Sequence, residues 1–505
     1  MTNQTTETSD DTMISQSDVI IIGTGFSGLG IATALKRSGR TSFVILERAD
    51  GVGGTWRDNT YPGAACDIQS HLYSYSFRPN PDWSRVYATQ PEILSYLQDT
   101  AVQEGLMPHI RFQADVKHAE WDAAEKVWRV HTEHGTYVAR ALVTATGHLS
   151  DPKMPAIEGL ESFAGELFHS AAWNHDVSLE GRRVGVLGTG ASAIQVVPEL
   201  AKSAAQLAVF QRSAPYLVPR RDYIYTEAEK GMFRKLPATA QAVRDGLFWG
   251  NEARFPQRQQ VPKFVDEIRA KALQHLNEQV RDTELLEKLT PDYEIGCKRI
   301  LISNDYYPAL AQPNVEVYTG GVQRVEGNTV YTGDGAGVEV DVLVCCTGFE
   351  AVDLPIAQRV TGRDGLLLAD RWSRGGQAYA CTTVAGFPNF FVMLGPNTGL
   401  GAGSIIYMVE TQISYIEQAL RYLQENDSVI EISEELEDQY VASIDDRAVG
   451  TVWTAGGCSS WYVDQRSGRL STLWPDFMSQ FRSENGTFDP DVYQTVPRCA
   501  AIEHA

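Results

Sequence analysis

The hydrophobic pattern is most regular close to the start of the chain. The apolar run 19–22 predicts a buried parallel strand, and a glycine-rich turn over 23–28 follows it. The next stretch, 29–35, has residues suited to helix packing, and a second strand over 42–46 ends at Glu47. This succession of strand, turn, helix, strand and acid is typical of a dinucleotide-binding unit, whereas an isolated glycine-rich turn would not be.

The turn has the spacing Gly-x-Gly-x-x-Gly, and each glycine has a physical task. Gly23 makes the tight turn, Gly25 lets the backbone approach a pyrophosphate, and Gly28 lets helix and strand pack closely. Unpaired N–H groups at the start of the helix favour this anion. Glu47 lies nineteen residues after Gly28, where a carboxylate binds a ribose 2′-hydroxyl. The residues expected to bind the dinucleotide are Gly23, Gly25, Phe26, Ser27, Gly28 and Glu47.

A second unit of the same kind follows later in the chain. Residues 183–187 predict a strand, the turn over 188–193 has alanine in place of the third glycine, and the strand 207–210 leads to Arg212. An arginine at this place accommodates a 2′-phosphate, which a glutamate repels. The first unit therefore predicts FAD or NAD and the second NADP; the alternative is that Arg212 is a solvated surface charge. The residues expected to bind NADP are Gly188, Gly190, Ala191, Ser192, Arg212 and Ser213.

The order of elements therefore occurs twice, and each half ends in a strand followed by Thr-Gly, at 146–147 and 347–348. Between the halves lies a stretch rich in Glu, Lys, Arg, Leu and Gln, which begins with a possible capping box at Thr226 and Glu229. A second capping box is expected at Thr89 and Glu92. We expect an α/β fold with two Rossmann-like domains: a disordered tail (1–17), an FAD-binding domain (18–150 and 346–505), an NADP-binding domain (151–215 and 294–345) and a helical insertion (216–293).

Composition and charge exclude several classes of function. The chain has 505 residues and a net charge of −21, with a pI of about 4.9, so nucleic acid and anionic membranes should repel it. It has no apolar run long enough to span a membrane and no signal peptide, which favours a cytoplasmic location. The seven cysteines form no CxxC pair and are odd in number, so we expect reduced thiols, no structural zinc and no redox disulfide.

Two dinucleotide sites in one chain indicate hydride transfer between two cofactors, from NADPH to FAD. The electrons must then reach an acceptor. A disulfide acceptor would need paired cysteines, so the sequence favours oxygen or a protein acceptor.

Four motifs resemble those of the type I Baeyer–Villiger monooxygenases. The family fingerprint FxGxxxHxxxW matches 163–173, and the pattern GGxWxxxxYPGxxxD matches 53–67. Gly-Cys-Lys-Arg at 296–299 is similar to the family's Gly-x-Lys-Arg, and Ser-Trp-Tyr at 460–462 to its motif near the nicotinamide. The resemblance covers roughly 18–480, and it departs from the family at Asn174, where Pro or Asp is usual. The fixed fingerprint residues are Phe163, Gly165, His169 and Trp173.

The resemblance implies a mechanism and roles for particular residues. Reduced flavin would convert O2 to a C4a-peroxide that attacks a ketone carbonyl and leaves an ester or lactone. Arg299 would be the catalytic cation for the anionic species, and Asp67 would hold it in place or cap its own loop. His169 would couple domain motion, and the helix after Ser404 would direct its N-terminus at the flavin. The cofactor contacts implied are Gly54, Thr55, Trp56, Asp67, Lys298, Asn397 and Trp461.

Each of these roles has a simpler alternative, and so does the activity. Lys298 could be a solvated lysine and Trp461 a core aromatic residue. A sulfide- or amine-oxidising flavin monooxygenase has a similar layout, although it typically has Tyr or Phe at the position of Trp173. An NADPH:flavin electron-transfer reductase is the third hypothesis, but it has no need of Arg299. The expected partners are a small ketone or a sulfide, and O2, with no nucleic acid, membrane or obligatory protein partner.

Overall fold

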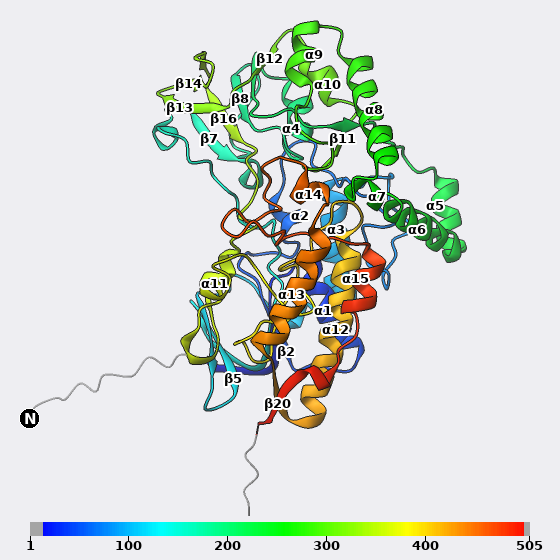
Figure 1. Ribbon diagram of the computed structural model, residues 1–505, viewed down its shortest axis with the longest axis vertical. Helices are drawn as coiled ribbons and strands as arrows, with labels where there is room; N and C mark the ends of the chain where they lie inside the picture. The colour runs from blue at the N-terminus through cyan, green and yellow to red at the C-terminus, as the bar shows by residue number, and fades with distance from the viewer. Residues whose placement is uncertain (1–13, 499–505) are drawn as a thin grey trace, which may run out of the picture.

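The computed structural model describes residues 14–498, which form two α/β parts, one in the lower and one in the upper half of the view (Figure 1). The lower part contains an eight-stranded sheet in the order β17-β4-β5-β6-β1-β2-β3, with β18 paired to β6. Its strands are β1 (Ile14–Ile22), β2 (Phe43–Leu46), β3 (Ile110–Arg111), β4 (His118–Asp122), β5 (Val127–Thr132), β6 (Gly135–Thr144), β17 (Val360–Thr361) and β18 (Phe390–Val392). Since β17 and β18 follow the upper part in sequence, the chain leaves the first sheet and returns to it.

Helices from both ends of the chain cover the lower sheet. The α1 helix packs along α12, and Gly30 makes this contact close, because a Cβ there would lie 2.6 Å from Ile413 Cδ1. A pair of antiparallel strands, β19 (Ser428–Ile432) and β20 (Tyr493–Pro497), closes the C-terminal segment. The helices are α1 (Phe26–Arg37), α2 (Thr55–Asp58), α3 (Gln90–Gln103), α11 (Leu368–Arg371), α12 (Ile405–Asn426), α13 (Glu434–Ala448), α14 (Val452–Ala455) and α15 (Met478–Asn485), with 3₁₀ turns at Met107–His109, Pro355–Gln358, Arg363–Gly365 and Pro490–Val492.

The upper part contains a parallel five-stranded sheet in the order β12-β9-β8-β16-β7. A three-stranded antiparallel sheet, β13-β14-β15, lies beside it. The elements are β7 (Glu166–His169), β8 (Arg183–Leu187), α4 (Ala193–Leu200), β9 (Gln206–Phe210), α10 (Tyr306–Leu310), β12 (Val315–Tyr318), β13 (Val322–Glu326), β14 (Thr329–Thr332), β15 (Gly337–Glu339) and β16 (Val342–Cys345), with 3₁₀ turns at Leu160–Ser162 and Ser170–Ala172. The α/β prediction with two Rossmann-like units is confirmed.

The two units use the same close approach at their glycine-rich turns. Gly23 has φ +107°, and a Cβ there would lie 2.7 Å from the carbonyl oxygen of Ala145. Gly188 has φ +105°, and its Cβ would lie 2.5 Å from the carbonyl oxygen of Cys346. Each turn is thus pressed against the residue that follows the last strand of its own half, which only glycine permits. The internal duplication extends to this contact.

The inserted stretch is mainly helical, and its helices project from the side of the molecule (Figure 1). Its capping box is confirmed, since Thr226 accepts from Glu229 N and the Glu229 carboxylate accepts from Thr226 N. The stretch also contains a strand that pairs in parallel with a strand beyond it, so 216–293 is not wholly helical. The elements are β10 (Leu217–Val218), α5 (Glu227–Lys235), α6 (Pro237–Glu252), α7 (Phe255–Arg258), α8 (Pro262–Gln279), α9 (Thr283–Leu289) and, after the insertion, β11 (Leu301–Ile302).

Two local predictions were wrong. The first strand begins at Ile14, so residues 14–17 do not belong to a disordered tail; residues 1–13 lie outside the described part of the chain. The predicted capping box at Thr89 is not formed: the side chain of Thr89 does not cap α3, and the Glu92 carboxylate accepts instead from the N–H and hydroxyl of Ser84, at 2.6 and 2.8 Å. A preceding loop can thus take the carboxylate that a capping box needs.

A substitution at Gly165 tests the packing of the fingerprint. A Cβ at Gly165 would lie 2.3 Å from the carbonyl oxygen of Asp341, which accepts from Glu166 N where β7 joins β16. We expect Gly165→Ala to destabilise the protein by about 1–3 kcal/mol through overpacking. The matched control is Gly231→Ala in α5, where a Cβ meets nothing within 4 Å and better helix propensity should add about 0.5–1 kcal/mol. Thermal unfolding measures both; equal midpoints for the two variants would contradict this packing argument.

Candidate active site

The first glycine-rich turn presents an uncovered backbone. Gly25 is the N-cap of α1 and provides no side-chain cap, and a Cβ there would find its nearest neighbour, Gly54 Cα, at 3.9 Å. The loop 53–56 crosses this turn, because a Cβ on Gly54 would lie 3.1 Å from Gly25 Cα. The N–H groups of Phe26 and Ser27 begin the helix at this point. A pyrophosphate fits this surface, since an uncapped helix N-terminus with no Cβ in front of it favours an anion.

Glu47 lies at the end of β2, directly beside the turn. Its carboxylate is 4% exposed, and Oε2 accepts from Thr24 N at 3.0 Å. Its Oε1 lies 2.9 Å from Arg57 Nη1, so the buried charge is paired. Two other predicted contacts also lie in this loop: Thr55 donates to Leu149 O at 3.2 Å, and Trp56 Nε1 donates to Tyr73 at 3.1 Å. The structure therefore brings this acid and the loop to one edge of the first sheet.

The second turn is also open, and positive charges gather near it. A Cβ at Gly190 would meet nothing within 4 Å, and Ser192, the N-cap of α4, provides no side-chain cap. Lys298 Nζ donates to Ser213 Oγ at 2.8 Å. Burial lowers the pKa of Lys298, and the nearby charge of Arg212 lowers it further. A site that holds two cations this close favours a dianion such as a 2′-phosphate.

Arg299 and Asp67 form an ion pair between the two halves of the chain. Arg299 Nη2 lies 2.7 Å from Asp67 Oδ2, with the side chains 39% and 29% exposed. The Asp67 charge raises the pKa of Arg299 and outweighs the opposing effect of burial, so the guanidinium keeps its charge. Burial raises the pKa of Tyr462, and the charge of Arg299 opposes this shift, which places the neutral phenol beside the pair. The arrangement offers a fixed cation to any negative charge that forms next to it.

The loop that carries Asp67 is docked onto the second unit. Tyr61 donates to Gln195 Oε1 at 3.0 Å, and Gln195 Nε2 donates to Ala65 O at 2.9 Å. Gly63 has φ +81°, and a Cβ there would lie 2.6 Å from the Gln195 carbonyl oxygen. Since Gln195 belongs to α4, this Tyr-Pro-Gly segment ties the first half to the helix of the second. The contact places Asp67 where Arg299 can reach it.

The predicted residues of the C-terminal segment are placed differently from one another. Asn397 is buried, and its amide donates to the carbonyl oxygens of Leu470 and Leu473, so its side chain orders the chain rather than facing a ligand. Trp461 is 43% exposed and its ring lies 6.1 Å from that of His148. The two rings line one recess of the surface. His148 was not predicted, although it directly follows Ala-Thr-Gly at 145–147.

The fingerprint residues lie where the chain crosses between the two parts. His169 ends β7, is 3% exposed, and accepts through Nδ1 from Ala171 N at 3.0 Å. Burial lowers the pKa of His169, and its ring lies 6.0 Å from that of Phe349. Phe349 bridges Pro152, so the two crossing segments lie side by side here. Phe163 packs on the upper sheet, and so does Trp173, which lies edge-on to Phe168 at 5.1 Å.

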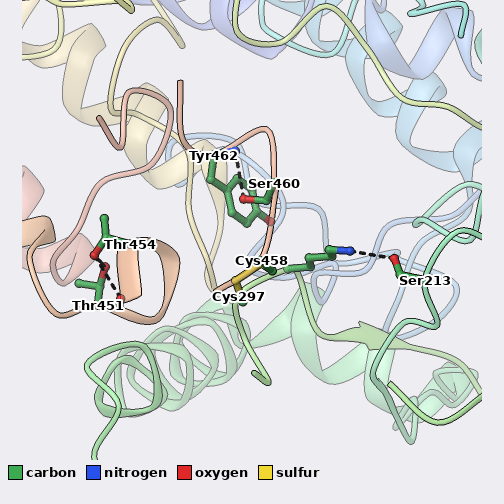
Figure 2. The surroundings of a disulfide bond; sticks show 8 residues. Ser213, Cys297, Thr451, Thr454, Cys458, Ser460 and Tyr462 are labelled. Atoms are coloured by element: carbon green, nitrogen blue, oxygen red, sulfur yellow. Dashed lines mark hydrogen bonds between the residues drawn. A yellow bond between two sulfur atoms is a disulfide. The ribbon is translucent and has the colours of Figure 1, made fainter. Parts of the chain in front are cut away.

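The prediction of reduced thiols was wrong for one pair of cysteines. Cys297 and Cys458 form a disulfide with a Cα–Cα distance of 6.2 Å (Figure 2). The two residues are 161 positions apart, so no local spacing could have indicated the pair. Four further cysteines of the described residues are free and buried: Cys66, Cys345, Cys346 and Cys381. The disulfide lies next to Lys298 and Arg299 in sequence.

The residues 14–498 include no helix with both the length and the apolar character needed to cross a membrane.

Comparisons with known proteins give the same picture over nearly the whole chain. Residues 20–226 match a family model described as pyridine nucleotide-disulphide oxidoreductase. A Baeyer-Villiger monooxygenase of Streptomyces coelicolor is 46% identical over 488 residues, which are 95% of this chain and 92% of the relative. A crystal structure of cyclohexanone monooxygenase from Rhodococcus sp. Phi1 bound to NADP+ has a TM-score of 0.83 and 30% identity, and covers 93% of this chain and 97% of its own. An OTEMO complex with FAD and NADP has a TM-score of 0.83 at 25% identity, covering 95% and 99%.

The first glycine-rich turn can be tested by adding one methyl group at Gly25. Gly25→Ala should fold normally, because its Cβ has no protein atom nearer than 3.9 Å. It should nevertheless lose FAD, since the Cβ occupies the space in which the backbone meets the pyrophosphate. The bound flavin of purified variant and wild type is measured by absorbance after denaturation, with Gly231→Ala as the control. A full complement of FAD in Gly25→Ala would remove this turn from the site.

The role of Arg212 near the second glycine-rich turn can be tested by measuring the preference for NADPH over NADH. Arg212→Ala should weaken the binding of NADPH by about 1.5–3 kcal/mol, which is the contribution of a charge-assisted contact to phosphate. NADH, which lacks the 2′-phosphate, should be affected little. The control is Arg281→Ala, an exposed arginine between α8 and α9 of the helical insertion. Steady-state kinetics with both coenzymes measure the effect, and an unchanged preference would make Arg212 a surface charge only.

Proposed function

We propose that this chain, which belongs to the Baeyer–Villiger monooxygenase family, inserts one oxygen atom of O2 next to a ketone carbonyl and uses Arg299 as its catalytic cation. It is a flavin-dependent enzyme that uses FAD and NADPH. The product is an ester or a lactone. The observation that supports the assignment to Arg299 is its 2.7 Å ion pair with Asp67.

The domains divide the work between the two cofactors. We assign FAD to the part formed by 18–150 and 346–505, where Gly25 and the loop 53–56 leave the backbone open. We assign NADPH to 151–215 and 294–345, which carry the second open turn. Bound FAD supplies the activated oxygen of the reaction, and the chain supplies the binding, the orientation and the charge.

Arg299 stabilises negative charge in two forms during oxygen transfer. The first is on the oxygen that attacks the carbonyl, and the second is on the tetrahedral adduct of the ketone. An arginine suits both, because its guanidinium stays charged and donates in a planar fork. Asp67 orients this fork through the ion pair, and its charge raises the pKa of Arg299. Asp67 is therefore assigned to positioning rather than to proton transfer.

The coenzyme is held by charge at one end and by the C-terminal segment at the other. Lys298, Ser213 and Arg212 bind the 2′-phosphate, supported by the 2.8 Å bond between the first two and by the effect of Arg212 on the Lys298 pKa. Trp461 borders the recess that also contains His148, where an aromatic ring can cover a nicotinamide. His169 is assigned to the connection between the two parts, because its ring packs against Phe349.

The proposed substrate is a small-molecule ketone, and the proposed location is the cytoplasm, which supplies NADPH. Two structural neighbours are a cyclohexanone monooxygenase and a steroid monooxygenase, which supports ketones as the substrate class. A sulfide is the second candidate, since the same activated oxygen can transfer to sulfur. The fixed charge of Arg299 favours the ketone, because only the carbonyl adduct develops an oxyanion.

Replacing Arg299 tests the central assignment. Removing one preorganised donor typically costs on the order of 10²–10³ in rate, so Arg299→Ala should lose ketone oxygenation by about that factor. Flavin reduction does not need this charge to the same degree, so NADPH oxidation should continue and yield hydrogen peroxide. Arg299→Lys should rescue poorly, because an ammonium cannot copy the planar fork.

Gas chromatography of products, with peroxide measured in parallel, distinguishes the outcomes, and Arg281→Ala is the matched control. Wild-type amounts of ester from Arg299→Ala would refute its catalytic role. Sulfoxide without ester from the wild type would favour the sulfide alternative.

A further inference from the structure

We propose that the Cys297–Cys458 disulfide is a redox-sensitive positioning device that holds Lys298 and Arg299 in the active site. The inference rests on the proposed function of these two residues. When the bond is intact, the coenzyme contact and the ion pair with Asp67 are kept in place. When a dithiol reduces it, both are loosened, and turnover becomes uncoupled from oxygen insertion.

The disulfide joins two segments that both carry active-site residues. Cys297 immediately precedes Lys298 and Arg299. Cys458 lies shortly before Trp461 and Tyr462, and the sulfurs, Ser460 and Tyr462 are close together in Figure 2. One segment belongs to the part assigned to NADPH and the other to the part assigned to FAD. The bond is therefore a covalent link across the two halves at the active site itself.

Each cysteine of the bond is preceded by a glycine with positive φ. Gly296 has φ +93° before Cys297, and Gly457 has φ +68° before Cys458. A Cβ at Gly456 would lie 3.2 Å from Cys297 Cβ and 2.3 Å from the carbonyl oxygen of Val452, so only glycine permits the approach. Glycine backbone retains more conformational freedom than any other when a restraint is removed. The covalent bond supplies the restraint that these flanking residues do not.

The noncovalent contacts of Arg299 are weak by comparison. Its ion pair with Asp67 is 39% and 29% exposed, and an ion pair open to solvent contributes little to holding a side chain. Lys298 is held by one hydrogen bond to Ser213 and by the ring of Tyr293, 4.6 Å away. A small displacement matters here, because a shift of about 1 Å at a reacting centre can cost roughly 10²-fold in rate.

The two sulfurs differ in accessibility, which makes the bond reducible from one side. Cys297 is 0% exposed and packs with Val452, Trp453 and Tyr462 in one apolar cluster. Cys458 is only partly buried at the edge of this cluster. A dithiol thiolate attacks Cys458 Sγ, the bond to Cys297 Sγ breaks, and the released Cys297 thiolate takes a proton. The second thiol then displaces Cys458, so two electrons pass to the protein and the dithiol becomes a cyclic disulfide.

The proposed cytoplasmic location gives the bond a physiological meaning. Stable disulfides are rare in the cytoplasm, where those present are usually transient or redox-sensing. A bond that fixes the catalytic cation would make coupling depend on the thiol balance of the cell.

The experiment compares three forms of full-length holoenzyme, each with and without dithiothreitol: wild type, Cys297→Ser/Cys458→Ser, and Cys345→Ala. Thiol titration of the denatured protein establishes the redox state, and the untreated wild type should show two thiols fewer than its seven cysteines. For each sample, KM for NADPH, the ratio of hydrogen peroxide to ester, and the thermal midpoint are measured. Cys345→Ala is the matched control, because Cys345 is free and fully buried in β16.

The reduced wild type and the double variant should agree with each other. Both should show KM for NADPH raised roughly tenfold, as expected from losing one charge-assisted contact, and a several-fold larger share of peroxide. Reoxidation should restore the wild type, and dithiothreitol should not affect the double variant. Cys345→Ala should respond to dithiothreitol as the wild type does, because it keeps the Cys297–Cys458 bond.

Two results would overturn the proposal. One is a full count of seven thiols in the untreated wild type. The other is a lower thermal midpoint with unchanged KM and peroxide ratio, which would make the bond structural only. A wild type that makes no ester from any ketone would instead refute the proposed function, so the two failures are distinguishable.

Discussion

The ion pair between Arg299 and Asp67 is the contact on which the proposed active site depends, because its partners come from different halves of the chain. Asp67 follows the Tyr-Pro-Gly segment that is docked onto α4 through Gln195. Arg299 follows Cys297, which is bonded to the C-terminal segment. Charge alone would hold two partly exposed side chains weakly, so the surrounding chain has to provide the geometry. In the proposed mechanism, the fold therefore brings one cation to a defined place between the two proposed nucleotide sites.

The two proposed nucleotide sites share one backbone arrangement but carry side chains of opposite charge. In each, a glycine with positive φ is pressed against the carbonyl after the last strand of its half, at Ala145 and at Cys346. The backbone in front of Gly25 and Gly190 is left open, which suits an anion at a helix N-terminus. The difference lies after the second strand of each unit, where one has a buried glutamate and the other an exposed arginine. This difference between an acidic and a basic residue supports the proposal that the two sites bind different dinucleotides.

Local patterns in the sequence predicted the parts of the structure that local physics determines. The strands on either side of each glycine turn and the capping box at Thr226 both depend on residues close in sequence. The predictions failed or were incomplete where distant segments determine the structure. Examples are the start of β1, the partner of Glu92 and the hydrogen bonds of the Asn397 amide. The disulfide is the extreme case, since its cysteines are brought together only by the folding of both halves.

The most direct test of oxygen insertion follows the oxygen atom itself. The enzyme is reduced anaerobically with NADPH and then mixed with oxygen-18 gas and a panel of ketones and sulfides, and the products are analysed by mass spectrometry. Our account predicts an ester or lactone that carries one labelled atom in the newly formed C–O–C linkage, with the carbonyl oxygen unlabelled. Label found only in hydrogen peroxide and water, with every ketone and sulfide unchanged, would contradict it.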